Sequence, residues 1–272
     1  MAYENIKYEK EDGIAIITLN RPQALNSISH PLAKEFEDAL SDIEKDDNVR
    51  AFIVTGGPRA DGRPCFCAGG DLREPPPADT RKPEDQAIAT LEAMVTGKSA
   101  RQGPGGTTVM EELNKSSKLS IAAVDGICTA GGLELALCCD IIVVSETAQI
   151  SDMHLKNLGT IGGAALSTKL ARRIPVSMAI ELCCTGDPID GKEAYRIGLA
   201  NHVYPPDKLL EGAKALAKKI ATMRLAGIRL TRATCKAVYD MDYYQTQRFQ
   251  DACCAVLDIG HEWKSQFEGG KR

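Results

Sequence analysis

The sequence predicts an α/β fold with mostly parallel strands joined by helices. Short apolar runs rich in β-branched residues alternate with longer stretches whose apolar residues recur at helical spacing. This alternation is typical of a parallel sheet with crossover helices, and periodicity alone favours a doubly wound sheet. No G-x-G-x-x-G follows a predicted strand, and no G-x-x-x-x-G-K-[ST] occurs, so a nucleotide fingerprint does not support that arrangement.

The predicted strands come first, and helices dominate the second half of the chain. Apolar runs predict strands at residues 14–19, 51–55, 121–124 and 141–145. Helical spacing predicts a longer series of elements. These helices are expected at residues 31–45, 83–96, 109–116, 133–139, 163–173, 176–185, 190–197, 207–221, 228–240 and 245–259.

Composition places the chain among ordinary globular proteins. Its 272 residues are 43% hydrophobic and 26% charged, enough for one large domain or a core with a smaller appendage. The net charge of -4 gives no general attraction to nucleic acid or anionic membranes. Residues 127–144 are apolar enough to suggest a membrane span, but Glu134, Asp140 and a glycine pair argue against it. We therefore expect neither nucleic acid nor a membrane as a partner.

Ten cysteines are many for a protein of this size, but their spacing predicts no metal site. There is no C-x-x-C motif, and adjacent cysteines such as Cys138 and Cys139 cannot easily form a disulfide. Most are expected to be small buried apolar residues in a reducing, cytoplasmic compartment, since the N-terminus has no apolar signal segment. Residues 65–67, beside a glycine-rich turn, are the candidates for a reactive thiol or a metal site.

The most informative segment is residues 121–142, IAAVDGICTAGGLELALCCDII. A β-like run ends at Asp125-Gly126, and Gly131-Gly132 then leads into a helical stretch. Glu134 is the lone acid in the apolar first turn of that stretch, and burial there would raise its pKa toward values useful to a general acid or base. A solvent-exposed Glu134 on an ordinary amphipathic helix is the alternative. Glycines and a helix start also offer free N–H groups to a negative oxygen.

A second glycine-rich turn, residues 67–72 (CAGGDL), follows the predicted strand at 51–55. Two such turns can each supply one backbone N–H to an ester or thioester oxygen. That arrangement is an oxyanion hole, in which loss of one donor typically costs about 3–4 kcal/mol of transition-state stabilisation. The two segments together predict a site that holds the carbonyl oxygen of a thioester or ester.

Five motifs in order resemble the crotonase superfamily, the enoyl-CoA hydratase and isomerase family. Besides residues 67–72 and 121–142, they are residues 16–26 (IITLNRPQALN), 159–163 (GTIGG) and 185–201 (TGDPIDGKEAYRIGLAN). The resemblance covers most of the chain. It implies a spiral of ββα units at residues 1–200, carrying the acyl-CoA site. It also implies a helical region at 201–272 that builds a homotrimer, often paired as a homohexamer.

The resemblance also implies roles for individual residues. The backbone N–H groups of Gly70 and Gly131 would hold the thioester oxygen, and Glu134 matches the first catalytic glutamate. Coenzyme A would enter as part of the substrate, with no separate cofactor and no metal. Its adenine and pantetheine would run along the backbone of Ala24, Ala68, Asp71 and Leu72. Arg21, Arg73 and Lys264 are candidates to meet its phosphates, although each also fits a solvated surface charge.

The position of the family's second glutamate is altered here. Counting back four residues from Gly159 gives Leu155, which cannot move protons, whereas counting forward from Gln149 gives His154. One inserted residue reconciles the two counts and places His154, or alternatively Asp152, in the second acid–base position. A structural histidine near a turn is the other interpretation of His154. The resemblance departs further at Ala130, where a third glycine is common, and at residues 263–267 (WKSQF), which replace the usual C-terminal motif.

Hydration or dehydration of an enoyl-CoA is the activity that these residues favour. Glu134 and His154 together could orient water and protonate the α-carbon, because an imidazole exchanges protons near neutral pH. Glu134 alone could support double-bond isomerisation, and an activated water could hydrolyse a thioester or open a ring. An RNA-binding or adaptor protein on the same scaffold is a remote alternative. Residues 73–106 are expected to form a surface insertion or the wall of the acyl pocket.

Overall fold

Six strands form the main sheet of the computed structural model, which describes residues 3–74, 80–96 and 108–259. Strand β1 at one edge is antiparallel to β2, and every other neighbouring pair in this sheet is parallel. The order across the sheet is β1 (Ile6–Glu11), β2 (Ile14–Leu19), β3 (Ala51–Gly56), β5 (Leu119–Val124), β7 (Ile141–Ser145) and β9 (His202–Tyr204).

Both faces of this sheet are covered, which explains why its central strands are apolar at nearly every position. Alternate residues of a strand point to opposite faces. In β3, Ile53 faces the cluster formed with helix α9 (Leu209–Ala221). Its neighbours Phe52 and Val54 face the larger cluster, to which α1 (His30–Lys45) and α4 (Gly131–Cys138) contribute.

A second, smaller sheet gives the chain its spiral course. Its parallel strands are β4 (Cys65–Cys67), β6 (Ile127–Thr129) and β8 (Gln149–Ser151). Each follows a strand of the main sheet, and β6 and β8 are followed by α4 and by α5 (His154–Leu158). This repeated strand–strand–helix winding is the predicted crotonase-like fold. The doubly wound sheet favoured by periodicity is wrong, because strands of three residues carry too short a pattern to be seen.

The predicted helices are all present, with ends that shift by a few residues. Helix α5 and strands β1, β4, β6, β8 and β9 were not predicted; they are short, except for β1, a sheet-edge strand whose IKYEKE sequence is two-thirds charged. No helix in the described part of the chain is long and apolar enough to span a membrane.

The remaining helices are α2 (Pro83–Thr96), α3 (Thr108–Lys115), α6 (Leu166–Arg173), α7 (Val176–Thr185), α8 (Gly191–Arg196), α10 (Leu225–Ala237) and α11 (Tyr243–Asp258), with short 3-10 helices at Pro22–Ala24 and Pro206–Lys208.

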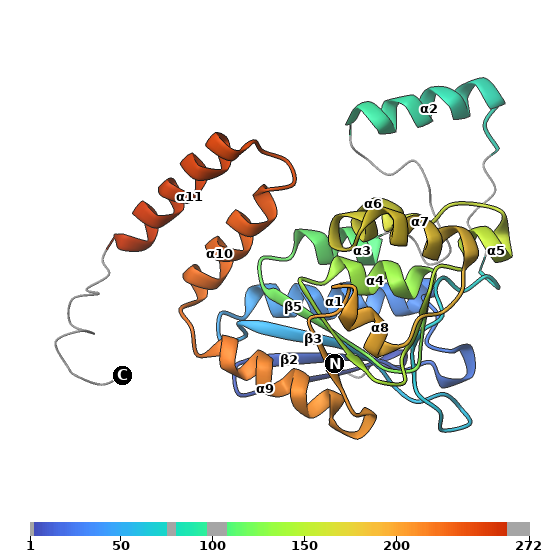
Figure 1. Cartoon of the computed structure of the whole chain (residues 1–272), viewed down its shortest axis with the longest axis horizontal. Coiled ribbons are helices and arrows are strands. Elements are labelled where there is room, and N and C mark those ends of the chain that lie inside the picture. The colour runs from blue at the N-terminus through green and yellow to red at the C-terminus, as the bar shows by residue number, and fades with distance from the viewer. Residues whose placement is uncertain (1–2, 75–79, 97–107, 260–272) are drawn as a thin grey trace.

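The last two helices lie to one side of the main body. Figure 1 shows α10 and α11 as an antiparallel pair joined to the rest by α9, while α2 stands apart near the opposite end. Strand β9 and helix α9 still pack on the main sheet, so residues just beyond 200 belong to its core. The division into regions 1–200 and 201–272 stays a prediction. Lys264 and residues 263–267 lie outside the described residues.

One buried amide joins the N-terminal turn to the first part of the spiral. Asn26 is fully buried, and its side-chain nitrogen donates to the carbonyls of Gly57 and Cys65, both at 2.8 Å. Its side-chain oxygen accepts from the Arg21 amide at 2.9 Å. One side chain therefore satisfies three backbone groups from separate segments. One of these groups, the Cys65 carbonyl, lies just before the glycine-rich turn at residues 67–72.

We expect Asn26→Ala to lower the free energy of unfolding by about 2–4 kcal/mol, because buried backbone groups that lose a partner cost about 1–3 kcal/mol each. Urea denaturation followed by circular dichroism measures the change. Asn48→Ala, at an exposed position, serves as the matched control. An Asn26→Ala protein as stable as that control would contradict the structural role of Asn26.

Candidate active site

Two glycine-rich turns meet backbone to backbone at the ends of β4 and β6. A Cβ atom built on Gly69 would lie 3.0 Å from the Gly131 nitrogen, and one built on Gly131 would lie 3.1 Å from the Gly70 nitrogen. Gly132 is closer still, since its Cβ would lie 2.1 Å from the carbonyl oxygen of Cys67. A side chain at Gly132 would collide with that carbonyl, and one at Gly69 or Gly131 would force its neighbour to shift, so the glycines let the two predicted oxyanion turns come together.

The amides of Gly70 and Gly131 do not donate to a carbonyl in the local backbone pairing. In the bridge between Ile28 and Gly70, the Ile28 amide donates to the Gly69 carbonyl and the Asp71 amide donates to the Ile28 carbonyl. The Gly70 amide takes no part in this pairing. Gly131 is the first residue of α4, where an N–H has no carbonyl to bond within the helix. Ala130 precedes it at φ 50°, ψ -120°, so the residue in place of the family's third glycine adopts a backbone conformation that L residues rarely take.

Glu134 lies buried in the first turn of α4 and is 7% exposed. Within the described residues its Oε1 atom has no hydrogen-bond partner. Burial raises the pKa of Glu134 most, and the charge of Asp152 adds to this, while His154, Lys169 and the Gly163 backbone act in the opposite direction. The exposed-glutamate alternative is therefore wrong, and a carboxyl that holds a proton unusually well lies in the first turn of the helix that begins at Gly131.

His154 faces Glu134 from the start of α5. Its Nε2 atom lies 3.8 Å from Glu134 Oε1, and its Nδ1 atom lies 2.6 Å from Asp152 Oδ1. The structure thus brings His154 to the position predicted from the insertion, with Asp152 behind it. Leu155, the alternative given by the other count, is 43% exposed.

The glycine-rich turn at residues 159–163 closes over this pair. A Cβ atom built on Gly162 would lie 3.1 Å from both Glu134 Oε1 and His154 Nδ1. The sequence motif marked this turn, but not its contact with the two titratable groups. The sequence could not reveal this contact, because β7 and β8 separate α4 from α5 and the turn along the chain.

The residues predicted to line the coenzyme A path lie near the first oxyanion turn. Ala24 ends a 3-10 helix, Ala68 donates its amide to the Leu25 carbonyl at 3.0 Å, and Leu72 is 64% exposed. Their side chains form no polar recognition site, consistent with contacts made by backbone.

Asp71 differs from its neighbours on this path because its side chain is buried. It binds Arg21 at 2.9 Å and Arg73 at 2.7 Å, and the Arg73 hydrogen bond is the largest cause that lowers its pKa. Arg21 is consequently not the solvated surface charge considered from the sequence. It also donates to the Ser27 carbonyl at 2.8 Å, so it helps to hold the turn that precedes α1.

The cysteines next to the site are structural. Cys65 and Cys67 are buried, and burial raises their pKa values to about 11 and about 12. A thiol of that pKa is almost entirely protonated near neutral pH and is a weak nucleophile. The reactivity considered for residues 65–67 is therefore not supported.

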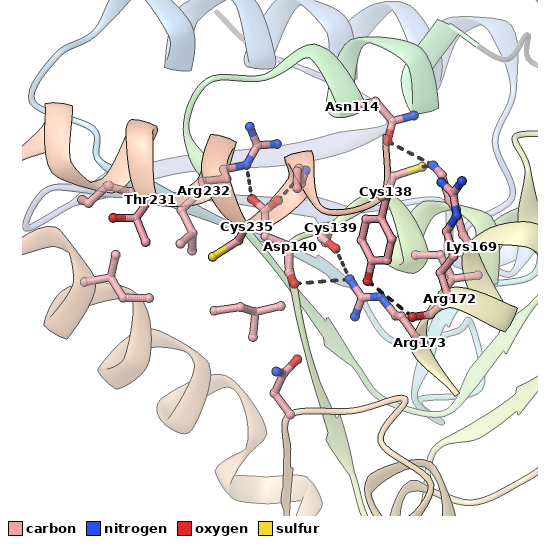
Figure 2. Close-up of a pocket in the computed structure, with 18 of the residues that line it drawn as sticks. Asn114, Cys138, Cys139, Asp140, Lys169, Arg172, Arg173, Thr231, Arg232 and Cys235 are labelled. Atoms are coloured by element: carbon pink, nitrogen blue, oxygen red, sulfur yellow. Dashed lines mark hydrogen bonds and ion pairs between the residues drawn. The ribbon is translucent and has the colours of Figure 1, made fainter. Parts of the chain in front are cut away.

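A cavity of about 1050 Å³ lies at the other end of α4, between α10 and the main body. Figure 2 shows Lys169 between Asn114 and Cys138, and Asp140 near Arg232 and Arg173. Glu134, His154 and the glycine turns do not line it. Because α4 separates it from the acid–base pair, this cavity is not where the chemistry of Glu134 takes place.

Glu134→Gln should stabilise the folded protein near neutral pH. A raised pKa means that folding disfavours ionised Glu134, so stability falls as pH rises from about 4.3, the ordinary carboxyl value, through the folded pKa. Glutamine does not ionise, so the free energy of unfolding of the variant does not fall for this reason. We expect it to exceed the wild type by roughly 0.5–2 kcal/mol at pH 8, as in other active sites relieved of a destabilising group, and to match it near pH 4.

Urea denaturation of both proteins between pH 4 and 8 measures this difference, with the exposed Glu9→Gln as control. A constant difference across that range would show that Glu134 has an ordinary pKa.

Comparison with known proteins identifies the family to which the chain belongs. The enoyl-CoA hydratase/isomerase family model matches residues 9–255. A probable enoyl-CoA hydratase of Rhizobium meliloti is 34% identical over 92% of this chain and 88% of its own length. A crotonyl-CoA hydratase of Syntrophomonas wolfei is 33% identical over 86% of this chain and 82% of its own.

Solved structures give the same result. A Geobacillus kaustophilus enoyl-CoA hydratase subunit aligns with a TM-score of 0.79 at 27% identity, covering 97% of this chain and 93% of its own. An enoyl-CoA hydratase from Bacillus anthracis aligns with a TM-score of 0.78 at 29% identity, covering 95% and 92%. The chain belongs to the enoyl-CoA hydratase/isomerase family, within the crotonase superfamily.

Proposed function

We propose that this protein is an enoyl-CoA hydratase that adds water across a conjugated C=C bond. The single observation that carries the proposal is the 3.8 Å approach of His154 Nε2 to Glu134 Oε1, which lies on the helix that begins at Gly131. Hydration needs two proton transfers, one from water and one to the α-carbon. Isomerisation needs only one group to carry a proton between carbons, so the pair favours hydration.

The two glycine amides are proposed to stabilise the enolate. As hydroxide bonds to the β-carbon, negative charge moves to the thioester oxygen. Gly70 and Gly131 would each donate an N–H to that oxygen, and such donors act most strongly where charge develops in the transition state. Their fixed backbone positions require little reorganisation during the reaction.

The acid–base pair would complete the addition. One member accepts a proton from water and the other gives a proton to the α-carbon, after which a proton passes between them and restores the resting state. A single oxygen atom can contact both groups, because they are separated by only 3.8 Å. Hydrolysis of a thioester or a ring would use the same amides, but would direct the water at a carbonyl carbon.

The proposal extends to binding and assembly. The acyl-CoA would lie along the backbone of Ala24, Ala68, Asp71 and Leu72, and no separate cofactor is needed. A homotrimer, or a homohexamer of two trimers, would cover the apolar side chains on and near α10 and α11. A cytoplasmic location fits ten free cysteines. The exposed apolar residues include Val238, Tyr239, Met241, Tyr243, Tyr244 and Val256.

Glu134→Gln should lower kcat for hydration of crotonyl-CoA by at least about a hundredfold, as expected for loss of a general acid or base. His154→Ala should also abolish hydration, while any isomerisation of a 3-enoyl-CoA survives. Loss of absorbance of the conjugated thioester follows hydration, and chromatography separates the bond-shifted product. Near wild-type hydration by either variant would exclude that residue from the mechanism.

Gly131→Val should weaken acyl-CoA binding at least about tenfold, because its side chain would crowd the Gly70 amide at 3.1 Å. Isothermal titration with a saturated acyl-CoA measures the affinity. Gly227→Val on α10 is the matched control, since a Cβ at that glycine meets no atom within 4 Å. Equal affinities for the two variants would count against the oxyanion assignment.

A further inference from the structure

We propose that Asp152 is a positioning residue for His154, holding a proton on Nδ1 so that Nε2 is the nitrogen that exchanges protons with the substrate. The inference rests on the proposed hydration. It differs from the sequence-based alternative in which Asp152 itself is the second acid, because the Asp152 carboxylate contacts the side of the imidazole that faces away from Glu134.

The contacts of one carboxylate oxygen carry the inference. Asp152 Oδ1 lies 2.6 Å from His154 Nδ1, and the same atom accepts the backbone N–H of His154 at 3.2 Å. An ionised carboxylate can only accept hydrogen bonds, so the nitrogen facing it must carry the proton. The other nitrogen, Nε2, is then the basic atom of the neutral ring, and it is directed at Glu134.

Asp152 is held in a fixed place in the fold. It follows β8 directly, is 3% exposed, and its carbonyl oxygen lies against the backbone of Gly186, whose Cβ would come within 3.0 Å. Gly186 ends α7 at a φ of 66°, a conformation that favours glycine. The backbone that carries the carboxylate is therefore held between the end of β8 and the end of α7.

The charged and titratable groups around the imidazole come from four elements. Glu134 approaches from α4 and Asp152 from the end of β8. Cys183 on α7 hydrogen-bonds Asp152, and its pKa is raised to about 12, mainly by burial. Lys169 on α6 acts on Glu134 through its charge. Although burial raises the pKa of Asp152, the hydrogen bonds from His154 outweigh it and keep that pKa below its usual value.

The tautomer assigns the two halves of the reaction. His154 Nε2 takes a proton from water, the water oxygen bonds to the β-carbon, and the π electrons move toward the thioester oxygen. Protonated Glu134 then gives its proton to the α-carbon as the enolate collapses. His154 returns its proton to Glu134, so one water is added and both groups are restored.

Nuclear magnetic resonance of protein labelled with ¹⁵N-histidine tests the tautomer directly. Four histidines give four ring patterns, and the His154→Gln variant identifies the one of interest. At pH 8 we expect His154 to be the Nδ1–H tautomer in the wild type. In Asp152→Asn the Nε2–H form should appear, and kcat should fall at least about tenfold because a protonated Nε2 cannot accept a proton from water, with KM changed less than about threefold.

The pH profile adds a readout that a purely structural role would not move. Removal of the Asp152 charge disfavours the imidazolium, so the limb of the kcat profile that reports His154 should shift to lower pH. Asp152→Glu, which keeps the charge, should retain the Nδ1–H tautomer. Asp187→Asn is the matched control, because that exposed carboxylate pairs with Lys156 rather than His154.

An Nε2–H tautomer in the wild type, or an unchanged tautomer and pH limb in Asp152→Asn, would overturn the inference. These outcomes are distinct from failure of the proposed function. If the wild type hydrated no enoyl-CoA, the function would be wrong whatever tautomer His154 adopts.

Discussion

The structure depends on one close backbone contact, the approach of the Gly69-Gly70 turn to the first turn of α4. Parallel pairing of β4 with β6 brings the ends of the two strands together, and the absence of side chains at Gly131 and Gly132 lets the turns touch. Two amides from segments about 60 residues apart thereby become neighbours. The buried Asn26 and the ion pairs of Asp71 stabilise one side of this contact, and the apolar body of α4 stabilises the other.

The acid–base groups depend on that contact because α4 carries both Gly131 and Glu134. Positioning the helix start against β4 also fixes a carboxyl in apolar surroundings, where its charge is disfavoured. The Asp152 carboxylate acts in the opposite way, since its hydrogen bonds favour the ionised form. Two acids within one site are thus separated in proton affinity by their surroundings, a pattern that suits groups with different tasks.

Much of the fold and part of the site could be predicted from local sequence. The apolar strands of the main sheet and the long helices have clear periods, and Gly70, Gly131 and Glu134 lie inside short motifs. The three-residue strands could not be predicted, because their pairing depends on segments far along the chain. The contact of Gly162 with Glu134 could not be predicted either, because these residues are also far apart along the chain. His154 could be reached only by allowing an insertion, and the role of Asp152 behind it required coordinates.

The Glu134 Oε1 atom has a consequence for ligand selectivity. No residue in the described part of the chain donates a hydrogen bond to it, so an incoming hydroxyl would bond there without breaking an existing hydrogen bond. A thioester bearing a β-hydroxyl should therefore be retained far better than its deoxy counterpart of nearly equal size. Discrimination of this kind would come from the polarity of a single oxygen atom rather than from the shape of the acyl pocket.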